Sequence, residues 1–341
     1  MGQAISKLTI KGYKSIRNLK DFELRNLNIL IGPNGSGKSN FVSFFELLQA
    51  IAKEKGLPHF YVQKKGGADR FLYLGSKVTQ SIKVELEILN LPLYTFELSI
   101  TANNQFSRST RIPIGDPHSA YIKRNDIEKI FSTYHFHDTS DFAGIKRPCS
   151  KRDYEYLRPD ASNLAAFLLF LRKKHEKEYQ YIREVIQLAA PFFDDFLLRD
   201  SLDNPDETLL EWQQKGSDYP FHPSQISDGT LRFICLATAL LQPDPPSTIL
   251  LDEPELGLHP FALALLAELI QKASLKTQII VATQSAALID HFQPEDIILV
   301  ERKNEESVFS RPDMEKLKIW LEDYSLGDIW SRNIIEGTAG Q

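Results

Sequence analysis

Gly32-Pro33-Asn34-Gly35-Ser36-Gly37-Lys38-Ser39 has the Gly-x4-Gly-Lys-Ser spacing of a phosphate-binding loop. The run before it, residues 26–31, is short and mostly apolar, as a buried strand should be. The run after it, residues 40–48, has helical spacing. Glycines allow the backbone angles that let several N–H groups converge on phosphate oxygens, and the N-terminus of the next helix adds a positive dipole end. Strand, glycine loop and helix together predict a binding site for a nucleoside triphosphate.

Two residues of this loop have predicted chemical roles. The Lys38 ammonium is expected to reach the β- and γ-phosphates, and the Ser39 hydroxyl is expected to ligate Mg2+. The other nucleotide contacts predicted from the loop and the helix start are Asn34, Gly35, Ser36, Gly37 and Asn40.

The composition is that of an ordinary soluble globular protein. The chain has 341 residues, 42% of them hydrophobic and 25% charged, which suits one large or two modest domains. Apolar runs all fall short of the roughly 18 residues that span a bilayer, so we predict no membrane association. The two cysteines, Cys149 and Cys235, form neither a metal-binding spacing nor a disulfide framework, which predicts a reducing, cytoplasmic setting.

Charge is unevenly distributed along the chain. Residues 1–199 carry 30 basic and 21 acidic side chains, whereas residues 200–341 carry 10 and 24, and the net charge is −5. A net-acidic chain does not indicate nucleic-acid binding as a whole. Its positive N-terminal part nevertheless leaves room for a surface that contacts a phosphate backbone.

The N-terminal part combines strand and helix patterns. Residues 4–31 predict strand, turn and strand, with a second pair of apolar runs ending at the phosphate loop, and the following helix is expected to end near Lys55. A glycine-containing loop follows. Residues 81–88 and 94–101 alternate apolar and polar side chains, which indicates an antiparallel hairpin with one solvated face, and a long polar segment continues to about Ser132.

The segment Ser132-Thr133-Tyr134-His135-Phe136-His137-Asp138 has the pattern of an edge strand that carries two histidines and an acid. As a metal site it is weak, because alternation places His135 and His137 on one face with no fourth ligand nearby. Partly buried histidines bonded to the backbone, or a position beside the nucleotide, are the other two interpretations.

Residues 163–190 predict a helical region, with apolar side chains at core spacing between Leu164 and Leu171. The charged stretch 172–178 leads into a second helix, and its mixed signs favour a solvated face over a binding patch. Heptad spacing does not continue beyond one or two repeats, so we expect no long coiled-coil arm.

A second group of motifs lies in the C-terminal half. Residues 224–232 open a helix that Ser227 is placed to cap, and Gly229 would let a phosphate approach the helix N-terminus. The next apolar strand ends in two acids, Asp252 and Glu253. We expect Asp252 to hold Mg2+ through water and Glu253 to orient or deprotonate the attacking water.

In this order the motifs resemble the ATPase heads of ABC proteins. The strand–GPNGSGKS–helix unit is followed by SDGTLR, ILLDEPELGLHP and VATQS, and within the superfamily the set is most similar to the RecF, SMC and OLD (overcoming lysogenisation defect) branch. Compact bacterial ATPases of this branch without long arms resemble the chain further in YKSI, YHFHDTS, NLAAFL and YSLGDIW, so the similarity covers nearly the whole sequence.

The resemblance implies an α/β fold, the ABC-ATPase head, in which a mixed P-loop sheet carries an antiparallel β lobe and a helical insertion lobe. We expect a single domain over residues 1–341, made of an N-terminal lobe (1–140), a helical insertion (141–225) and a part with signature, Walker B and switch (226–341). A nuclease (Toprim) segment is not expected, and residues 302–341 should hold a strand, a helix and a tail.

It also implies a composite site in an ATP-sandwiched dimer. Ser227 and Gly229 stand at the signature motif, which in such heads faces the phosphate loop of a second protomer, and residues 255–259 stand at the D-loop.

Two positions depart from the family pattern. Gln284 stands at the switch, where many relatives have histidine; glutamine can hydrogen-bond a γ-phosphate but carries no proton at neutral pH, which predicts slower or differently controlled switching. The usual Q-loop glutamine is not obvious. From its place in the chain, His137 with Asp138 is expected to fill that role beside the nucleotide, and Gln63 is a weaker candidate.

The predicted activity is hydrolysis of ATP to ADP and phosphate with ATP and Mg2+ as cofactors, and the predicted catalytic residues are Glu253, Lys38 and Gln284. A homodimer or higher oligomer would control DNA binding or a separately encoded effector such as a nuclease, in DNA repair or anti-phage defence. The alternative is a nucleotide-dependent scaffold that barely turns over. An ABC transporter's ATPase subunit is disfavoured by the hairpin after the phosphate loop and by the DEPELGLHP form, and a small-molecule kinase by the lack of a recognisable lid.

Overall fold

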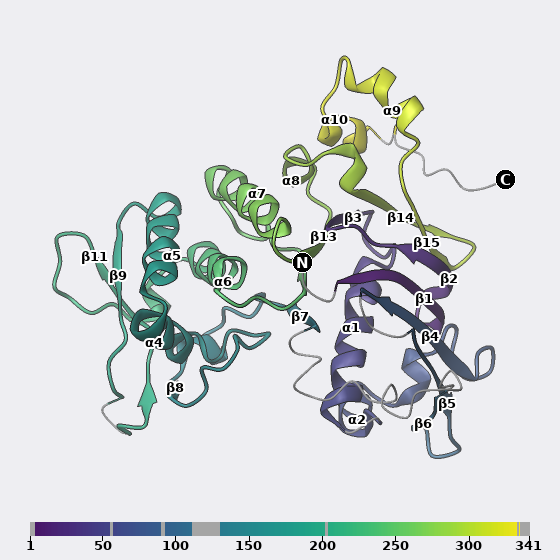
Figure 1. The fold of residues 1–341 in the computed structure, drawn as a ribbon, viewed down its shortest axis with the longest axis horizontal. Helices are drawn as coiled ribbons and strands as arrows, with labels where there is room; N and C mark the ends of the chain where they lie inside the picture. The colour runs from purple at the N-terminus through teal and green to yellow at the C-terminus, as the bar shows by residue number, and fades with distance from the viewer. Residues whose placement is uncertain are drawn as a thin grey trace. The chain divides into compact units, whose positions relative to one another are not determined.

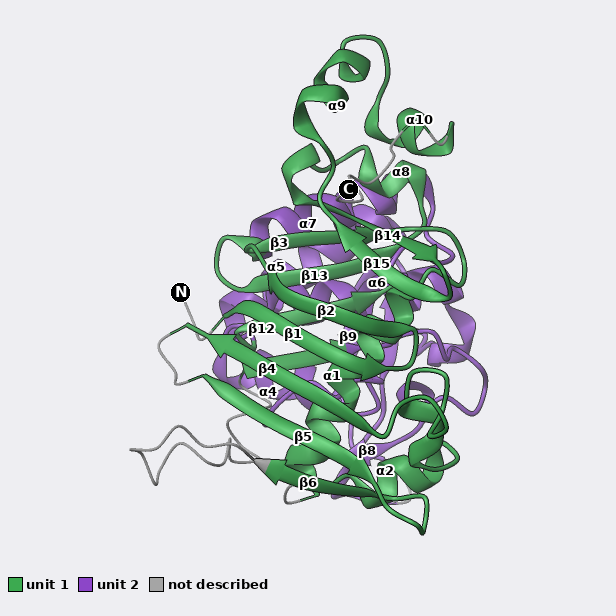
Figure 2. Cartoon of the chain, turned by 90° about the vertical axis from the view of Figure 1, so that its right-hand side faces the viewer, with its two compact units in different colours: residues 1–133, 246–252, 274–341 green, residues 134–245, 253–273 purple. Residues whose placement is uncertain are grey.

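The computed structural model describes residues 4–54, 57–89, 93–110, 130–201, 204–332 and 334. The chain forms two compact units (Figure 2): unit 1 comprises residues 1–133, 246–252 and 274–341, and unit 2 comprises residues 134–245 and 253–273. Within the described ranges, none of the helices combines the length and the apolar character needed to cross a membrane.

Unit 1 is built on two sheets (Figure 1). Its strands are β1 (Ile5–Tyr13), β2 (Ile16–Glu23), β3 (Leu27–Ile31), β4 (Ser81–Ile88), β5 (Tyr94–Ile100), β6 (Phe106–Thr110), β7 (Phe131–Tyr134), β12 (Thr248–Asp252), β13 (Gln278–Thr283), β14 (Ile297–Lys303) and β15 (Glu306–Ser310). Its helices are α1 (Lys38–Lys53), α2 (His59–Lys64), α8 (Ala286–Ile289), α9 (Met314–Leu321) and α10 (Leu326–Ser331).

The two sheets confirm the predicted mixed α/β architecture. One is antiparallel and has the strand order β2-β1-β4-β5-β6, in which β4 and β5 are the predicted hairpin. The other has the order β15-β14-β3-β13-β12-β7, and its central strands β14, β3, β13 and β12 run parallel. Buried parallel strands need no alternation, and β3 and β13 are buried along their whole length.

Helix α1 begins directly after the phosphate loop and packs into the core shared by both sheets. Phe41, Phe44 and Phe45 are fully buried on it, and the ring of Phe44 packs edge-on against Tyr13 of β1 at 5.4 Å. Burying each such ring contributes roughly 1.5–3 kcal/mol, so this helix, and with it the start of the loop, is firmly held.

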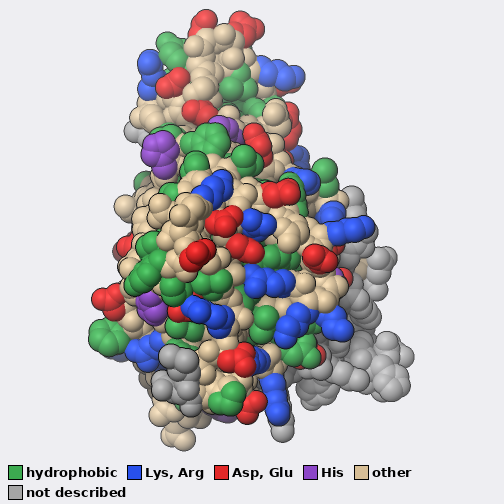
Figure 3. Space-filling view, turned by 90° about the vertical axis from the view of Figure 1, so that its left-hand side faces the viewer, with side chains coloured by type: hydrophobic (Ala, Val, Ile, Leu, Met, Phe, Trp, Pro, Cys, Tyr) green, Lys and Arg blue, Asp and Glu red, His purple; other side chains and the backbone are tan. Residues whose placement is uncertain are grey.

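Unit 2 is mainly helical. Its helices are α4 (Leu164–Lys174), α5 (Glu176–Ala189), α6 (Asp228–Leu241) and α7 (Pro260–Ser274), and its short strands are β8 (Cys149–Ser150), β9 (Phe193–Leu197), β10 (Glu207–Thr208) and β11 (Glu211–Gln214). The predicted pair of helices over residues 163–190 is confirmed, with the break at His175. Lysines and arginines on the face drawn in Figure 3 are interspersed with aspartates and glutamates, in agreement with a solvated surface.

Several local expectations were wrong. Helix α2 forms where a loop was predicted, because the Glu54 carboxylate accepts the backbone N–H groups of Phe60 and Tyr61 at 2.6 and 2.9 Å and so satisfies the helix start. Strand β6, which was not predicted, forms within the long polar segment; residues 111–129 of that segment lie outside the described residues. Strand β7 ends at Tyr134, before either histidine, and two short helices follow β15 instead of one.

Candidate nucleotide-binding site

The carboxyl ends of three neighbouring parallel strands bring predicted site residues to one edge of the unit 1 sheet. Ile31, the last residue of β3, pairs with Thr283 of β13, and Ala282 of β13 pairs with Asp252, the last residue of β12. The phosphate loop follows β3 and Gln284 follows β13. Adjacent strands lie about 4.8 Å apart, so Asp252 ends about 10 Å from the start of the phosphate loop across this edge.

The phosphate loop has the backbone shape that its glycines predict. Gly35 and Gly37 adopt φ values of 78° and 115°, in the left-handed region. The Lys38 side chain is buried, and its ammonium donates to the Gly32 carbonyl at 2.6 Å and to the Pro33 carbonyl at 3.2 Å. These carbonyls hold the ammonium at the loop, where a phosphate could exchange for one of them.

Two further features of the loop fit a bound phosphate. The Ser36 hydroxyl is buried and makes no hydrogen bond within the described ranges of the chain. Apart from its two chain neighbours, no atom of the described residues lies within 4 Å of the position where Gly35 would carry a side chain, so the backbone is open to a ligand there. Ser39, at the start of α1, is exposed and free of the core, as a Mg2+ ligand would have to be. The residues present therefore fit a magnesium nucleotide.

Lys14 adds a second cation beside α1. It adopts φ 45° in the turn between β1 and β2, and its ammonium donates to the Ser43 hydroxyl at 2.7 Å. Burial lowers the pKa of this ammonium from its ordinary value, and the negative charge of Glu46 partly opposes that shift. Lys14 belongs to the YKSI segment, and the local sequence there gave no reason to expect its contact with Ser43 of helix α1.

The acids after β12 differ in backbone geometry. Asp252 continues the strand, whereas Glu253 has φ 43°, in the left-handed region that costs a residue with a β-carbon roughly 1 kcal/mol or more. Backbone strain of this kind concentrates at functional sites, where the surrounding structure enforces it. The strain at Glu253 therefore supports a functional constraint at the position predicted to be catalytic.

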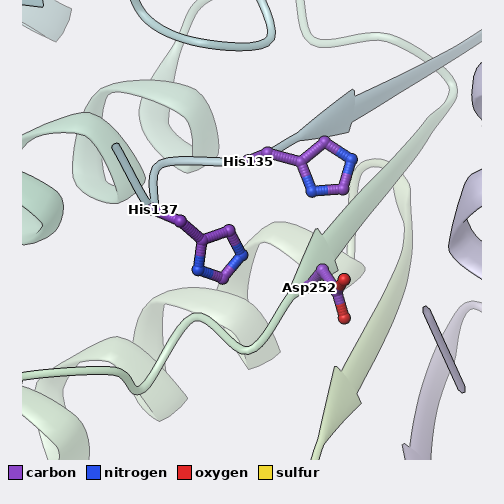
Figure 4. A group of neighbouring side chains, drawn as sticks. All are labelled: His135, His137 and Asp252. Carbon is purple, nitrogen blue, oxygen red and sulfur yellow. The ribbon is translucent and has the colours of Figure 1, made fainter. Parts of the chain in front are cut away.

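The two histidines lie beyond β7 (Figure 4), where the figure also draws Asp252 at the end of β12. The rings of His135 and His137 are neighbours, with centroids 6.1 Å apart and an interplanar angle of 35°. The His135 backbone N–H donates to the Pro159 carbonyl at 2.9 Å, which fixes the course of this segment in unit 2. A role for His137 beside the nucleotide stays a prediction, and so does the weaker candidate Gln63, which is exposed on α2.

Ser227 caps helix α6, as predicted. Its hydroxyl accepts the Thr230 backbone N–H at 3.2 Å, and Ser227 and Asp228 are exposed. The structure explains why residue 229 is a glycine, which the local sequence did not show. A β-carbon at this position would lie 2.1 Å from the Gly257 carbonyl oxygen. Close approach of the D-loop backbone thus requires glycine in the signature segment, independently of any phosphate.

Arg232, one turn further along α6, was missed as a functional candidate. Its guanidinium donates to the carbonyl oxygens of Phe136 at 3.2 Å, His137 at 3.0 Å and Leu256 at 3.1 Å. A planar guanidinium offers five donors in a fixed fork, so one side chain can bond three carbonyls on two backbone segments. Within unit 2, Arg232 therefore joins the signature helix, the D-loop segment and the segment that carries His137.

Replacing Arg232 by methionine should separate nucleotide binding from turnover. The variant leaves two part-buried carbonyls, of Phe136 and His137, and the exposed carbonyl of Leu256 without their donor, which should lower the free energy of unfolding by about 1–3 kcal/mol. We expect the phosphate loop of unit 1 to set the affinity for ATP, so this affinity should change less than twofold, whereas turnover should fall at least tenfold. Fluorescent-nucleotide titration, steady-state ATPase and urea unfolding measure the three quantities. Arg199→Met, which removes an exposed ion pair with Glu211, is the control; a folded Arg232→Met protein with normal turnover would contradict the assignment.

The sheet order, the phosphate loop and the family match described next define the class of this protein: it is an AAA-type domain with the fold of SMC ATPase heads. The chain belongs to the family described as "AAA domain, putative AbiEii toxin, Type IV TA system", whose sequence model matches residues 27–290. No curated protein sequence matches the chain.

Solved structures show the same fold at low sequence identity. An Smc head bound to the C-terminal winged-helix domain of ScpA is 17% identical, with a TM-score of 0.65 over 93% of this chain and 99% of that one. The Smc head with an extended coiled coil from Pyrococcus furiosus is 17% identical, with a TM-score of 0.60 over 94% and 99%. The Smc head with a coiled coil and joint from Pyrococcus yayanosii is 12% identical, with a TM-score of 0.56 over 94% of this chain and 99% of that one.

Proposed function

We propose that the protein binds and hydrolyses ATP as one half of an ATP-sandwiched dimer, and that the dimer controls a partner effector or DNA. The observation that carries this proposal is the shared sheet edge, where strand register places the phosphate loop, Asp252 and Gln284 side by side. Ligands of open α/β sheets bind at the carboxyl ends of the strands, which supports the same location.

In this proposal each residue has one task. Lys38 and the loop N–H groups bind the β- and γ-phosphates. Mg2+, held by Ser39 and through water by Asp252, would neutralise charge on the β- and γ-phosphates. Glu253 orients the attacking water and accepts its proton, and Gln284 donates a hydrogen bond to the γ-phosphate.

A second protomer completes the site. Ser227 and Asp228 are exposed at the N-terminus of the 14-residue helix α6, whose dipole and N–H groups favour a phosphate. We infer that Ser227 and Gly229 contact the nucleotide held by the loop of the other chain. Hydrolysis should then depend on protein concentration.

The charges of unit 1 favour an effector protein over DNA as the partner. On its antiparallel sheet Lys7 pairs with Glu23 at 3.5 Å, and Lys83 lies 3.9 Å from Glu97, so these two lysines are matched by acids. A surface that tracks a phosphate backbone needs a net positive patch. The family description, which names a putative toxin of a toxin–antitoxin system, supports a role in defence.

A nucleotide-dependent scaffold is the second candidate, because Gln284 cannot carry a proton at neutral pH. Steady-state ATPase measurements with and without DNA or effector separate the two. Turnover that stays below one per several minutes under all conditions, with normal ATP binding, would favour the scaffold.

Replacing Lys38 by alanine should abolish nucleotide binding. The change removes a buried ammonium that is bonded to the loop carbonyls, and the affinity for ATP should fall at least a hundredfold, about 2.7 kcal/mol. Titration with a fluorescent ATP analogue measures the loss. Lys38→Met, which keeps the aliphatic stem in the core, should bind as weakly if the ammonium matters; unchanged affinity in either variant contradicts the role given to Lys38.

A further inference from the structure

The β14–β15 hairpin packs directly against the phosphate loop, although the two are distant in the sequence. A β-carbon on Gly32 would lie 2.1 Å from the Val300 carbonyl oxygen, and one on Gly37 would lie 2.0 Å from the Ser307 hydroxyl. Both glycines of the motif are therefore in direct contact with this hairpin. The conformation of the phosphate loop therefore depends on its contacts with this hairpin as well as on its own sequence.

A line of buried hydroxyls links the hairpin to the loop. The Asn40 amide donates to the Ser15 hydroxyl at 2.7 Å, Ser15 and Ser307 hydroxyls lie 2.7 Å apart, and Ser307 donates to the Ser36 carbonyl at 2.5 Å. Ser15 and Ser307 are only 6% and 7% exposed. Ser307 is the donor in both of its bonds, so its single proton is shared between the Ser36 carbonyl, which can only accept, and the Ser15 hydroxyl, which also accepts from Asn40.

The last bond in this line acts on the peptide that joins Ser36 to Gly37. A trans peptide is planar, so its carbonyl oxygen and its N–H point in opposite directions. Holding the Ser36 carbonyl on the hairpin side therefore turns the Gly37 N–H to the other side. Gly37, at φ 115°, has no side chain to restrain that rotation.

We propose that Ser307 is a positioning residue for the nucleotide: by holding the Ser36 carbonyl, it keeps the Gly37 N–H directed toward the phosphates. The proposal rests on the proposed function in one respect, that the loop binds ATP. It adds that the affinity for ATP depends on the Ser307 hydroxyl, which does not itself contact the nucleotide. The Ser36 carbonyl would otherwise be free to turn into the space that the phosphate occupies, where its partial negative charge repels the ligand.

The test compares Ser307→Ala with Ser310→Ala. Both serines lie on β15, but the Ser310 hydroxyl is buried and makes no hydrogen bond to any part of the chain that the structure describes. Ser307→Ala should raise the dissociation constant for magnesium ATP, measured with a fluorescent analogue, about tenfold. KM should rise by a similar factor while kcat changes less than twofold, because the N–H contact is made equally in the ground state and the transition state. Ser310→Ala should change neither quantity by more than twofold.

A purely structural role predicts a different pattern. It would lower the melting temperature without the tenfold change in affinity, and Ser307→Thr, which keeps the hydroxyl in a strand position that tolerates β-branching, would not recover binding. We expect Ser307→Thr to restore the affinity to within threefold. If Ser307→Ala does not fold, Ser307→Val decides, because valine has the shape of threonine without the hydroxyl and should raise the dissociation constant about tenfold relative to Ser307→Thr.

The possible failures are distinguishable. A wild-type protein that does not bind ATP contradicts the proposed function. A wild-type protein that binds ATP overturns the positioning role alone if Ser307→Ala binds as tightly as Ser310→Ala, or if the substitute Ser307→Val binds as tightly as Ser307→Thr.

Discussion

Glu253→Gln should bind ATP as tightly as the wild type, lose at least a hundredfold in turnover, and accumulate as an ATP-bound dimer. Glutamine has the size and hydrogen-bonding reach of glutamate, but its amide does not accept a proton from the attacking water at neutral pH. The backbone at φ 43° is equally strained for both residues, so the exchange isolates the carboxylate. A hundredfold loss corresponds to about 2.7 kcal/mol of transition-state stabilisation.

Gel filtration with light scattering, in magnesium ATP and in its absence, measures the trapped dimer. Glu268→Gln on the exposed face of α7 is the matched control and should behave as the wild type. If Glu253→Gln hydrolyses ATP normally, Glu253 is not the base. If it fails to hydrolyse yet stays monomeric at every nucleotide concentration, the site is not completed by a second chain.

Mixing Lys38→Ala with Ser227→Arg should restore ATPase activity that neither protein has alone. In a two-fold symmetric dimer each site combines the phosphate loop of one chain with the signature segment of the other, so a mixed dimer holds one site without either substitution. With random pairing at equal amounts, about a quarter of the wild-type sites are intact. Arginine at position 227 places bulk at the exposed start of α6, where the second chain would contribute to the site.

Loss of the helix cap is the confounding effect in this experiment. Ser227→Arg also removes the hydroxyl that accepts the Thr230 N–H, which costs about 1 kcal/mol. Ser325→Arg removes the corresponding cap of α10 and should leave turnover unchanged. Activity is measured across mixing ratios at constant total protein; a baseline that never rises would show that each chain completes its own site.

The features predicted correctly from sequence have short-range causes. The phosphate loop and α1 follow from glycine freedom, helical spacing and a motif of eight neighbouring residues. The hairpin of β4 and β5 follows from the alternation of apolar and polar side chains along both strands. The Ser227 cap follows from the position of one hydroxyl directly before a helix. Where prediction failed locally, at α2 and β6, a side chain or a neighbouring strand supplied hydrogen bonds that the segment's own sequence does not contain.

Sequence by itself thus determined the class of fold, the loop that should bind phosphate and the acids that end β12. Only the tertiary structure decided how the loop is held: Ser15, Ser307 and the Ser36 carbonyl meet because the turn between β1 and β2, strand β15 and the loop converge in unit 1. In the same way, Arg232 and the Gly229–Gly257 contact became visible only with the packing of unit 2. Contacts between residues so distant along the chain depend on strand register and helix packing, and no local pattern encodes them.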